Sequence, residues 1–190
     1  DRIEAQLLLR PFLGEVYVGV TIHFEGQLLD DDKYASLLEE VAAVAVPRGW
    51  PLREINEAQM ALNRVVDERS VDYLGPVTGM ELLPHPRADP LRFEFDRHLF
   101  VQQYCKTQFA GSEAHIEIVE LLRKIAPLFV EFDVFDEGQY WETGDRSILQ
   151  RNLDTVEAMI AEAMNKDPAA RGPLRLESGR VIDFVSDPDA

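Results

Sequence analysis

Hydrophobic and polar residues alternate along EVYVGVTIHFEG, the segment that starts at Glu15. Val20, Ile22 and Phe24 fall on one face of this segment, and His23 falls on the other. Alternation with a period of two residues is typical of a β-strand that buries one face. The preceding run, AQLLLRPFLG, is expected to be a partner strand, with its turn at residues 11–14. That run is short enough for a helical turn to fit as well.

Four later segments repeat apolar residues at intervals of three and four, which predicts helices. The first two of these segments are separated by PRGWP, whose prolines and glycine break a helix. The predicted helices cover residues 33–46, 55–66, 113–126 and 146–165. Asp30 to Asp32 supply carboxylates that can cap the first helix, and Asp145 can cap the last.

Further strands are predicted where short runs rich in β-branched and aromatic residues lie between turn signals. Three runs stand around the turn PHPRADP, a fourth lies at residues 130–134, and LRLESGRVIDFV reads as a hairpin around Ser178 and Gly179. In HLFVQQYCKTQF both faces carry apolar residues, so this strand is expected inside a sheet. The order of elements favours an α+β fold with a mixed, largely antiparallel sheet and helices mainly on one side. At 190 residues, the chain 1–190 is expected to form a single domain.

The charge of the chain narrows the choice of partners. The formal net charge is -16, from 35 acidic and 19 basic residues. This sign repels phosphate backbones, so no nucleic-acid partner is expected. A basic protein, a cation and simple solubility all fit an acidic chain. No apolar run approaches the roughly 20 residues of a membrane span, so no membrane partner is expected.

The sequence carries no template of a common enzyme. It has no GxGxxG, GKS or GKT, GxSxG, HExxH or CxxC pattern, so no cofactor is predicted and enzymatic activity stays open. The single cysteine, Cys105, cannot form an internal disulfide, which favours a cytoplasmic location. Cys105 lies on an apolar face, so a nucleophilic Cys105–His115 pair is disfavoured against an inert core cysteine.

The segment VEFDVFDEGQYWETGD, residues 130–145, gathers six carboxylates around two aromatics and contains no basic residue. Its acids do not follow the spacing of a calcium loop, so no metal site is predicted. Part of the cluster has a local role, because Glu142 and Asp145 precede a helix and suit its positive end. Tyr140 and Trp141 remain unexplained by capping, and at least one of them is expected to be buried.

Two functional interpretations follow, beside a purely structural turn. The first is an acidic, cytoplasmic interaction or inhibitor-type protein that docks a basic partner through the loop from Asp136 to Asp145. The residues predicted to bind the partner are Asp136, Glu137, Tyr140, Trp141, Glu142 and Asp145. The second is a small-ligand binder or enzyme with a pocket formed by Lys106, His115 and Glu142. His115 falls within an apolar helical arc, where a histidine bonded to a backbone carbonyl is the simpler interpretation. The identity of the partner and the oligomeric state are not predicted.

Overall fold

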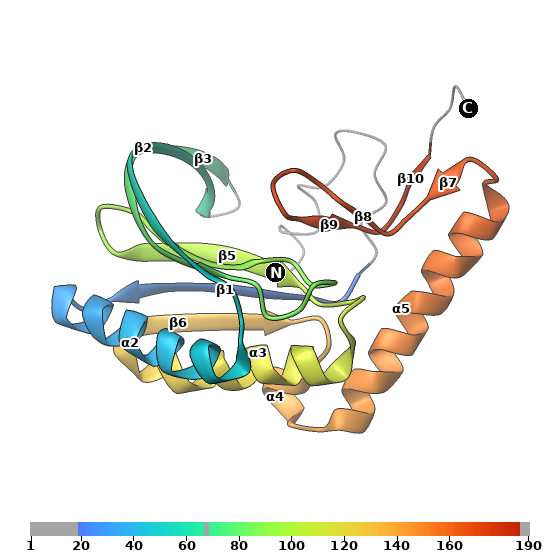
Figure 1. Ribbon diagram of the computed structural model, residues 1–190, viewed down its shortest axis with the longest axis horizontal. Helices are drawn as coiled ribbons and strands as arrows, with labels where there is room; N and C mark the ends of the chain where they lie inside the picture. The colour runs from blue at the N-terminus through green and yellow to red at the C-terminus, as the bar shows by residue number, and fades with distance from the viewer. Residues whose placement is uncertain (1–18, 67–68, 187–190) are drawn as a thin grey trace.

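The computed structural model describes residues 19–66 and 69–186. Within them the chain folds as α+β, with every strand pair antiparallel (Figure 1). The elements are β1 Thr21–Leu28, α2 Asp31–Arg48, β2 Leu52–Val66, β3 Arg69–Leu82, β4 Leu91–Phe95, β5 Phe100–Lys106, α3 Gly111–Ile125, a 3-10 turn Ala126–Leu128, β6 Phe129–Asp136, α4 Tyr140–Thr143, α5 Arg146–Lys166, β7 Ala170–Arg171, β8 Leu174–Arg175, β9 Val181–Ile182 and β10 Val185–Ser186. The predicted fold class is confirmed.

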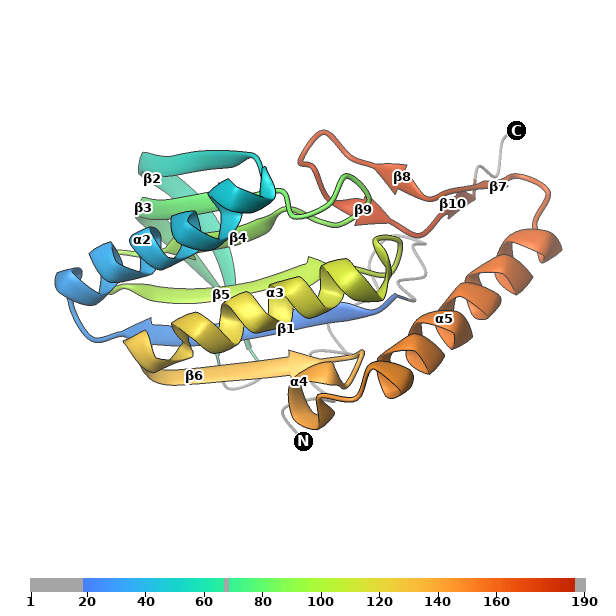
Figure 2. The same ribbon diagram turned by 60° about the horizontal axis from the view of Figure 1, so that its bottom comes forward.

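Two three-stranded sheets form the body, in the orders β5-β1-β6 and β2-β3-β4. Their adjoining strands β4 and β5 are linked at both ends, because the Asp96 N–H donates to the Phe100 carbonyl and the Asp89 N–H to the Lys106 carbonyl. Helices α2 and α3 cover one side of this curved layer (Figures 1 and 2). The strand β5 was expected inside a sheet, but it ends the first sheet, and β1 is the central strand.

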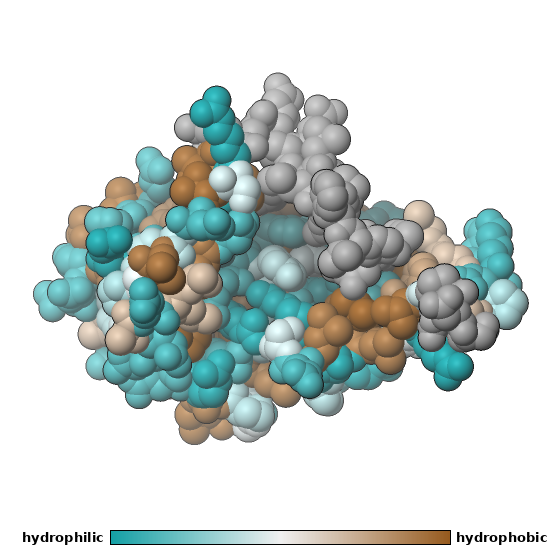
Figure 3. Space-filling model, turned by 90° about the horizontal axis from the view of Figure 1, so that it is seen from above, coloured by the Kyte–Doolittle hydropathy of each residue, from teal (hydrophilic) through white to brown (hydrophobic). Residues whose placement is uncertain are grey.

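One hydrophobic core lies between the strands and the helices α2 and α3. Its buried members come from β1, α2, β3, β4, β5 and α3, and include Ile22, Leu37, Phe93, Cys105 and Leu121. Alternation along β1 explains this arrangement, since Ile22 and Phe24 are buried while His23 stays partly exposed. The opposite side, seen in Figure 3, is hollowed in its middle and mainly hydrophilic there. Buried residues also lie outside this main core, because Ile55, Leu62 and Val77 form a separate small cluster on β2 and β3, and the polar side chains of Arg64 and Glu94 are buried.

The helices predicted at residues 33–46, 113–126 and 146–165 are confirmed as α2, α3 and α5. Asp30 caps α2 by accepting the Lys33 N–H at 2.9 Å. The helix predicted at 55–66 is wrong, because these residues belong to β2, which pairs with β3 along its length. The predicted partner strand in AQLLLRPFLG lies outside the described residues.

The C-terminal segment contains the predicted hairpin, with β8 and β9 paired around the turn at Gly179. It forms a small sheet of its own, and β7 and β10 form another. The long helix α5 runs between the end of the main layer and this segment (Figure 1). Strand β6 lies at the rim of the main layer, with α4 following at its end (Figure 2).

Candidate functional site

The segment that joins β6 to α5 is organised by one buried carboxylate, Asp136. Its exposed fraction is 1%. Its Oδ1 accepts the Gly138 N–H at 2.7 Å, and its Oδ2 accepts the N–H groups of Tyr140 at 2.8 Å and Trp141 at 2.9 Å. Three amides of one turn therefore converge on a single side chain. This arrangement satisfies the N–H groups that the short helix α4 leaves unpaired at its start.

His115 holds Asp136 from the core side. The imidazole is fully buried on α3, with Nε2 3.0 Å from Asp136 Oδ2 and Nδ1 2.7 Å from Thr107 Oγ1. Nε2 lies within hydrogen-bond distance of the carboxylate, and Nδ1 shares a hydrogen bond with the Thr107 hydroxyl, which also donates to the Val20 carbonyl at 3.3 Å. The prediction that His115 points inward is confirmed, but its partners are a hydroxyl and a carboxylate instead of a backbone carbonyl.

Electrostatics favour the ionised form of Asp136. Burial alone would raise the pKa of this carboxyl, but the hydrogen bond and charge of His115 and the amides of Trp141 and Gly138 outweigh burial, so the pKa is lowered. The turn around it is tightly packed. A Cβ at Gly138 would lie 2.6 Å from Leu149 Cδ1 and 2.9 Å from His115 Cε1. Only glycine fits there without displacing a neighbour.

Backbone geometry also fixes the turn. Gln139 has φ 62° and ψ 15°, a left-handed conformation that non-glycine residues rarely adopt. Gly144, which ends α4, has φ 63°. Strained residues of this kind persist where the surrounding structure holds them. Within the loop from Asp136 to Asp145, residues Tyr140–Thr143 thus form a short, fixed helical turn.

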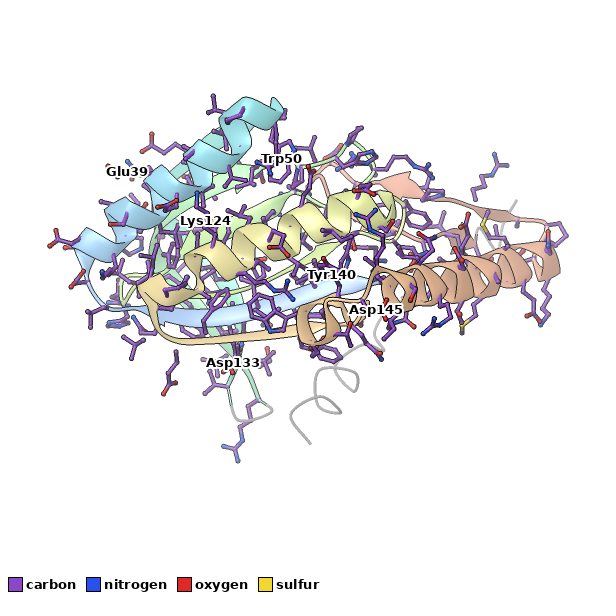
Figure 4. The ribbon with its side chains drawn as sticks, turned by 90° about the horizontal axis from the view of Figure 1, so that it is seen from below. Glu39, Trp50, Lys124, Asp133, Tyr140 and Asp145 are labelled. Carbon is purple, nitrogen blue, oxygen red and sulfur yellow. The ribbon has the colours of Figure 1, made fainter. Side chains whose placement is uncertain are left out.

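The two aromatics of α4 are both half-buried and pack against the main core. The Trp141 ring meets Phe132 of β6 edge-on, with centroids 6.4 Å apart. Arg123 of α3 covers the aromatic pair, with its guanidinium carbon 5.4 Å from the Tyr140 ring centroid and 5.7 Å from that of Trp141. The same guanidinium donates to the Tyr140 carbonyl at 3.1 Å and the Trp141 carbonyl at 2.8 Å. Figure 4 shows Tyr140 between α3 and the start of α5.

The remaining predicted acids differ in their surroundings. Glu137 is partly buried, and its Oε2 accepts the Thr21 N–H at 2.9 Å. Asp145 caps α5 as predicted, because it accepts the Ser147 N–H at 2.8 Å and the Ser147 hydroxyl at 2.6 Å. These hydrogen bonds lower the pKa of Asp145. Glu142 is exposed. Of the six predicted residues, Asp136 lies under the surface, and Glu142 and Asp145 present their charges to solvent.

The residues of the alternative pocket are engaged elsewhere. The Lys106 ammonium lies 3.0 Å from both carboxylate oxygens of the buried Asp183. His115 is closed within the network described above, and Glu142 is exposed. Cys105 is fully buried, and burial raises the pKa of its thiol, which disfavours the thiolate. These positions give no support to a pocket between Lys106, His115 and Glu142.

A second polar cluster, which the sequence did not reveal, ties the C-terminal hairpin to the body. Asp89, 1% exposed, accepts the Val181 N–H at 2.6 Å on Oδ1. Its Oδ2 accepts the Lys106 N–H at 3.2 Å and the Arg180 guanidinium at 3.2 Å. These groups are separated by up to 92 positions in the chain. No local spacing pattern could have indicated this cluster.

Among residues 19–66 and 69–186, no group of three or more histidine, cysteine, aspartate or glutamate side chains is placed to hold a metal ion. Within the same residues, no helix has the length and apolar character to cross a membrane. No protein-family model matches the chain, and no curated protein or solved structure matches it either.

Proposed function

We propose that this chain is an acidic interaction or inhibitor-type protein that docks a basic protein through the loop from Asp136 to Asp145. The observation that carries the proposal is the buried carboxylate of Asp136, which fixes the backbone of an exposed acidic turn through three amides. A surface turn held in one conformation loses little conformational entropy on binding. Such preorganisation suits a docking element.

The composition of the turn supports a basic partner. Glu142 and Asp145 are exposed, and the segment 130–145 contains no lysine or arginine. Of the nearby cations, Arg123 is directed at backbone carbonyls and aromatic rings of α4, and Arg146 pairs with Glu113, while Arg151 acts on Asp145. The negative charge of the exposed Glu142 adds to the net charge of -16 and can steer a basic surface.

Tyr140 and Trp141 would supply the apolar contact. Both rings are half-buried, so each is held by the core while part of it remains at the surface. Partly exposed aromatics on a rigid support are common anchors in protein interfaces. The acids around them would then act mainly on the rate of association.

The proposal is tested by capture of a partner from a lysate of the natural source, with the immobilised wild type and two double variants compared at several salt concentrations. Trp141→Ala/Glu142→Lys alters the turn. Met159→Ala/Glu157→Lys makes the same change of charge and removes an exposed apolar side chain on α5, where Met159 is 52% exposed.

The proposal predicts a basic protein that binds the wild type and the α5 variant, and that is released as salt rises. The turn variant should bind the purified partner roughly 30-fold more weakly, a loss typical of an interface hot spot. Circular dichroism and thermal unfolding check that each variant is folded. Equal binding by a folded turn variant would contradict the assignment.

A further inference from the structure

The outer edge of β6 adjoins the proposed docking turn. β6 ends the sheet β5-β1-β6, and within the described part of the chain its one strand neighbour is β1. Trp141 of the turn packs on Phe132 in the middle of this strand. Figure 2 shows β6 as the outermost strand of the layer, and Figure 4 places Asp133 at that rim. The turn and the edge therefore form one continuous surface.

The hydrogen bonds of β1 show which backbone groups of β6 face outward. The Val20 carbonyl and the Leu28 N–H bond toward β5, whereas the Thr21 carbonyl accepts the Glu137 N–H on the β6 side. In an antiparallel ladder these directions alternate from residue to residue. Odd-numbered residues of β1 thus bond to Glu131, Asp133 and Phe135, their register partners. The N–H and C=O groups of Phe132 and Val134 point away from β1, along the outer edge.

The side chains of β6 divide between two faces. Phe132 and Val134 are partly buried on the helix side, where they pack against the core beside Trp141. Glu131 and Asp133 are exposed on the other side. A strand added to this edge would therefore meet an apolar surface on one face and carboxylates on the other.

From this arrangement we infer that β6 accepts an extended basic segment of the partner as an additional antiparallel strand, with arginine or lysine at alternate positions. The inference rests on the proposed function and names how the partner binds. Main-chain hydrogen bonds to an exposed sheet edge are an established mode of peptide recognition. Charge selects the occupant, because pairing with a second copy would bring Glu131 and Asp133 against the same acids.

The geometry also fixes the register of side chains in the added strand. Residues opposite Phe132 and Val134 direct their N–H groups to β6 and their side chains to the helix side, near Trp141. Residues opposite Glu131 and Asp133 direct their side chains to the carboxylates and their N–H groups away from β6. Apolar residues suit the first set, and basic residues suit the second.

The test uses a short peptide of alternating arginine and valine and two N-methylated forms. Methylation of the valine amides removes the donors that face β6, whereas methylation of the arginine amides leaves them intact. Binding is measured by calorimetry at low salt. Hydrogen exchange of the Phe132 and Val134 amides is followed by NMR, since a new ladder bond slows exchange.

The inference predicts that the unmodified and arginine-methylated peptides bind with similar affinity and protect Phe132 and Val134. The valine-methylated peptide should bind at least about tenfold more weakly, equivalent to about 1.4 kcal/mol. Equal binding of both methylated peptides, absence of the two protections, or no binding of any peptide would overturn strand addition. Capture that depends on Trp141 and Glu142 would still stand in those cases, so failure here differs from failure of the proposed function.

Discussion

Two buried aspartates use the same chemistry for different purposes. Asp136 and Asp89 each have 1% exposure, and each accepts backbone N–H groups on both carboxylate oxygens. The amides bound by Asp136 lie within five positions of it, at the surface turn 138–141. Those bound by Asp89 belong to β5 and to the distant C-terminal hairpin.

The difference shows how each carboxylate serves the fold. The Arg180 guanidinium lies beside Asp89. Lys106, whose backbone N–H donates to Asp89, bonds the carboxylate of Asp183 through its ammonium group. Acids of that region are balanced by cations within the chain. Asp136 instead shapes a turn whose acids face solvent. One region closes the fold, and the other holds acidic side chains at the surface.

The largest effect is expected from Asp136→Ala. This change leaves His115 without its carboxylate in a fully buried site and removes the acceptor of three amides. Loss of one member of a buried pair costs roughly 3–5 kcal/mol of unfolding free energy. Urea unfolding measures the loss, and hydrogen exchange should show Gly138–Gly144 opening first. A loss below about 1 kcal/mol would mean that Asp136 does not organise the turn.

Asp89→Ala should have a smaller and spatially separate effect. Its Arg180 partner keeps part of its side chain exposed, at 13%, and can regain water. Unsatisfied buried donors cost about 1–3 kcal/mol, so this is the expected loss. Hydrogen exchange of the backbone amides should become faster at residues 174–182. Binding of the captured partner should be unchanged. Weakened binding in this variant, equal to that of Asp136→Ala, would remove the distinction between the regions.

Much of this architecture follows from local patterns. The helices α2, α3 and α5 have regular apolar spacing, and α2 and α5 have capping aspartates, so they were predictable. β2 was not, because LREINEAQMALNRVV is rich in good helix formers such as Glu54, Ala58 and Leu62. Pairing with β3 overrides that propensity. The bulge of β2 lies opposite Pro76, which has no N–H to offer the ladder.

The candidate site was predictable only in its location. The acids and aromatics of residues 136–145 stood out in the sequence, and His115 was correctly placed inward. Nothing local could join His115 to Asp136, which lies 21 positions away, or indicate that Arg123 would cover α4. These contacts depend on how α3 packs against β6. Asp136, predicted to face a partner, is instead the support beneath the surface.

Acidification should have a smaller effect on the free energy of unfolding, and this effect should depend on Asp136. The pKa of Asp136 is lowered in the folded chain, so its contribution to stability is present above the unfolded-state pKa of about 3.9. That contribution is lost as the pH falls through the lower, folded-state pKa. Urea unfolding between pH 7 and pH 3 should therefore show a shallower decline for Asp136→Asn than for the wild type. Parallel curves would show that Asp136 is not stabilised as an anion.

In the proposed function, the turn fixed by Asp136 is the part of the molecule that meets a basic partner. The most direct measurement is an NMR titration of the isotopically labelled protein with the purified partner, read at every assigned amide. We expect the largest shifts at Gly138–Gly144 and along β6, and we expect them to weaken as salt rises. Largest shifts at the hairpin of residues 174–182, with the turn unchanged, would contradict it.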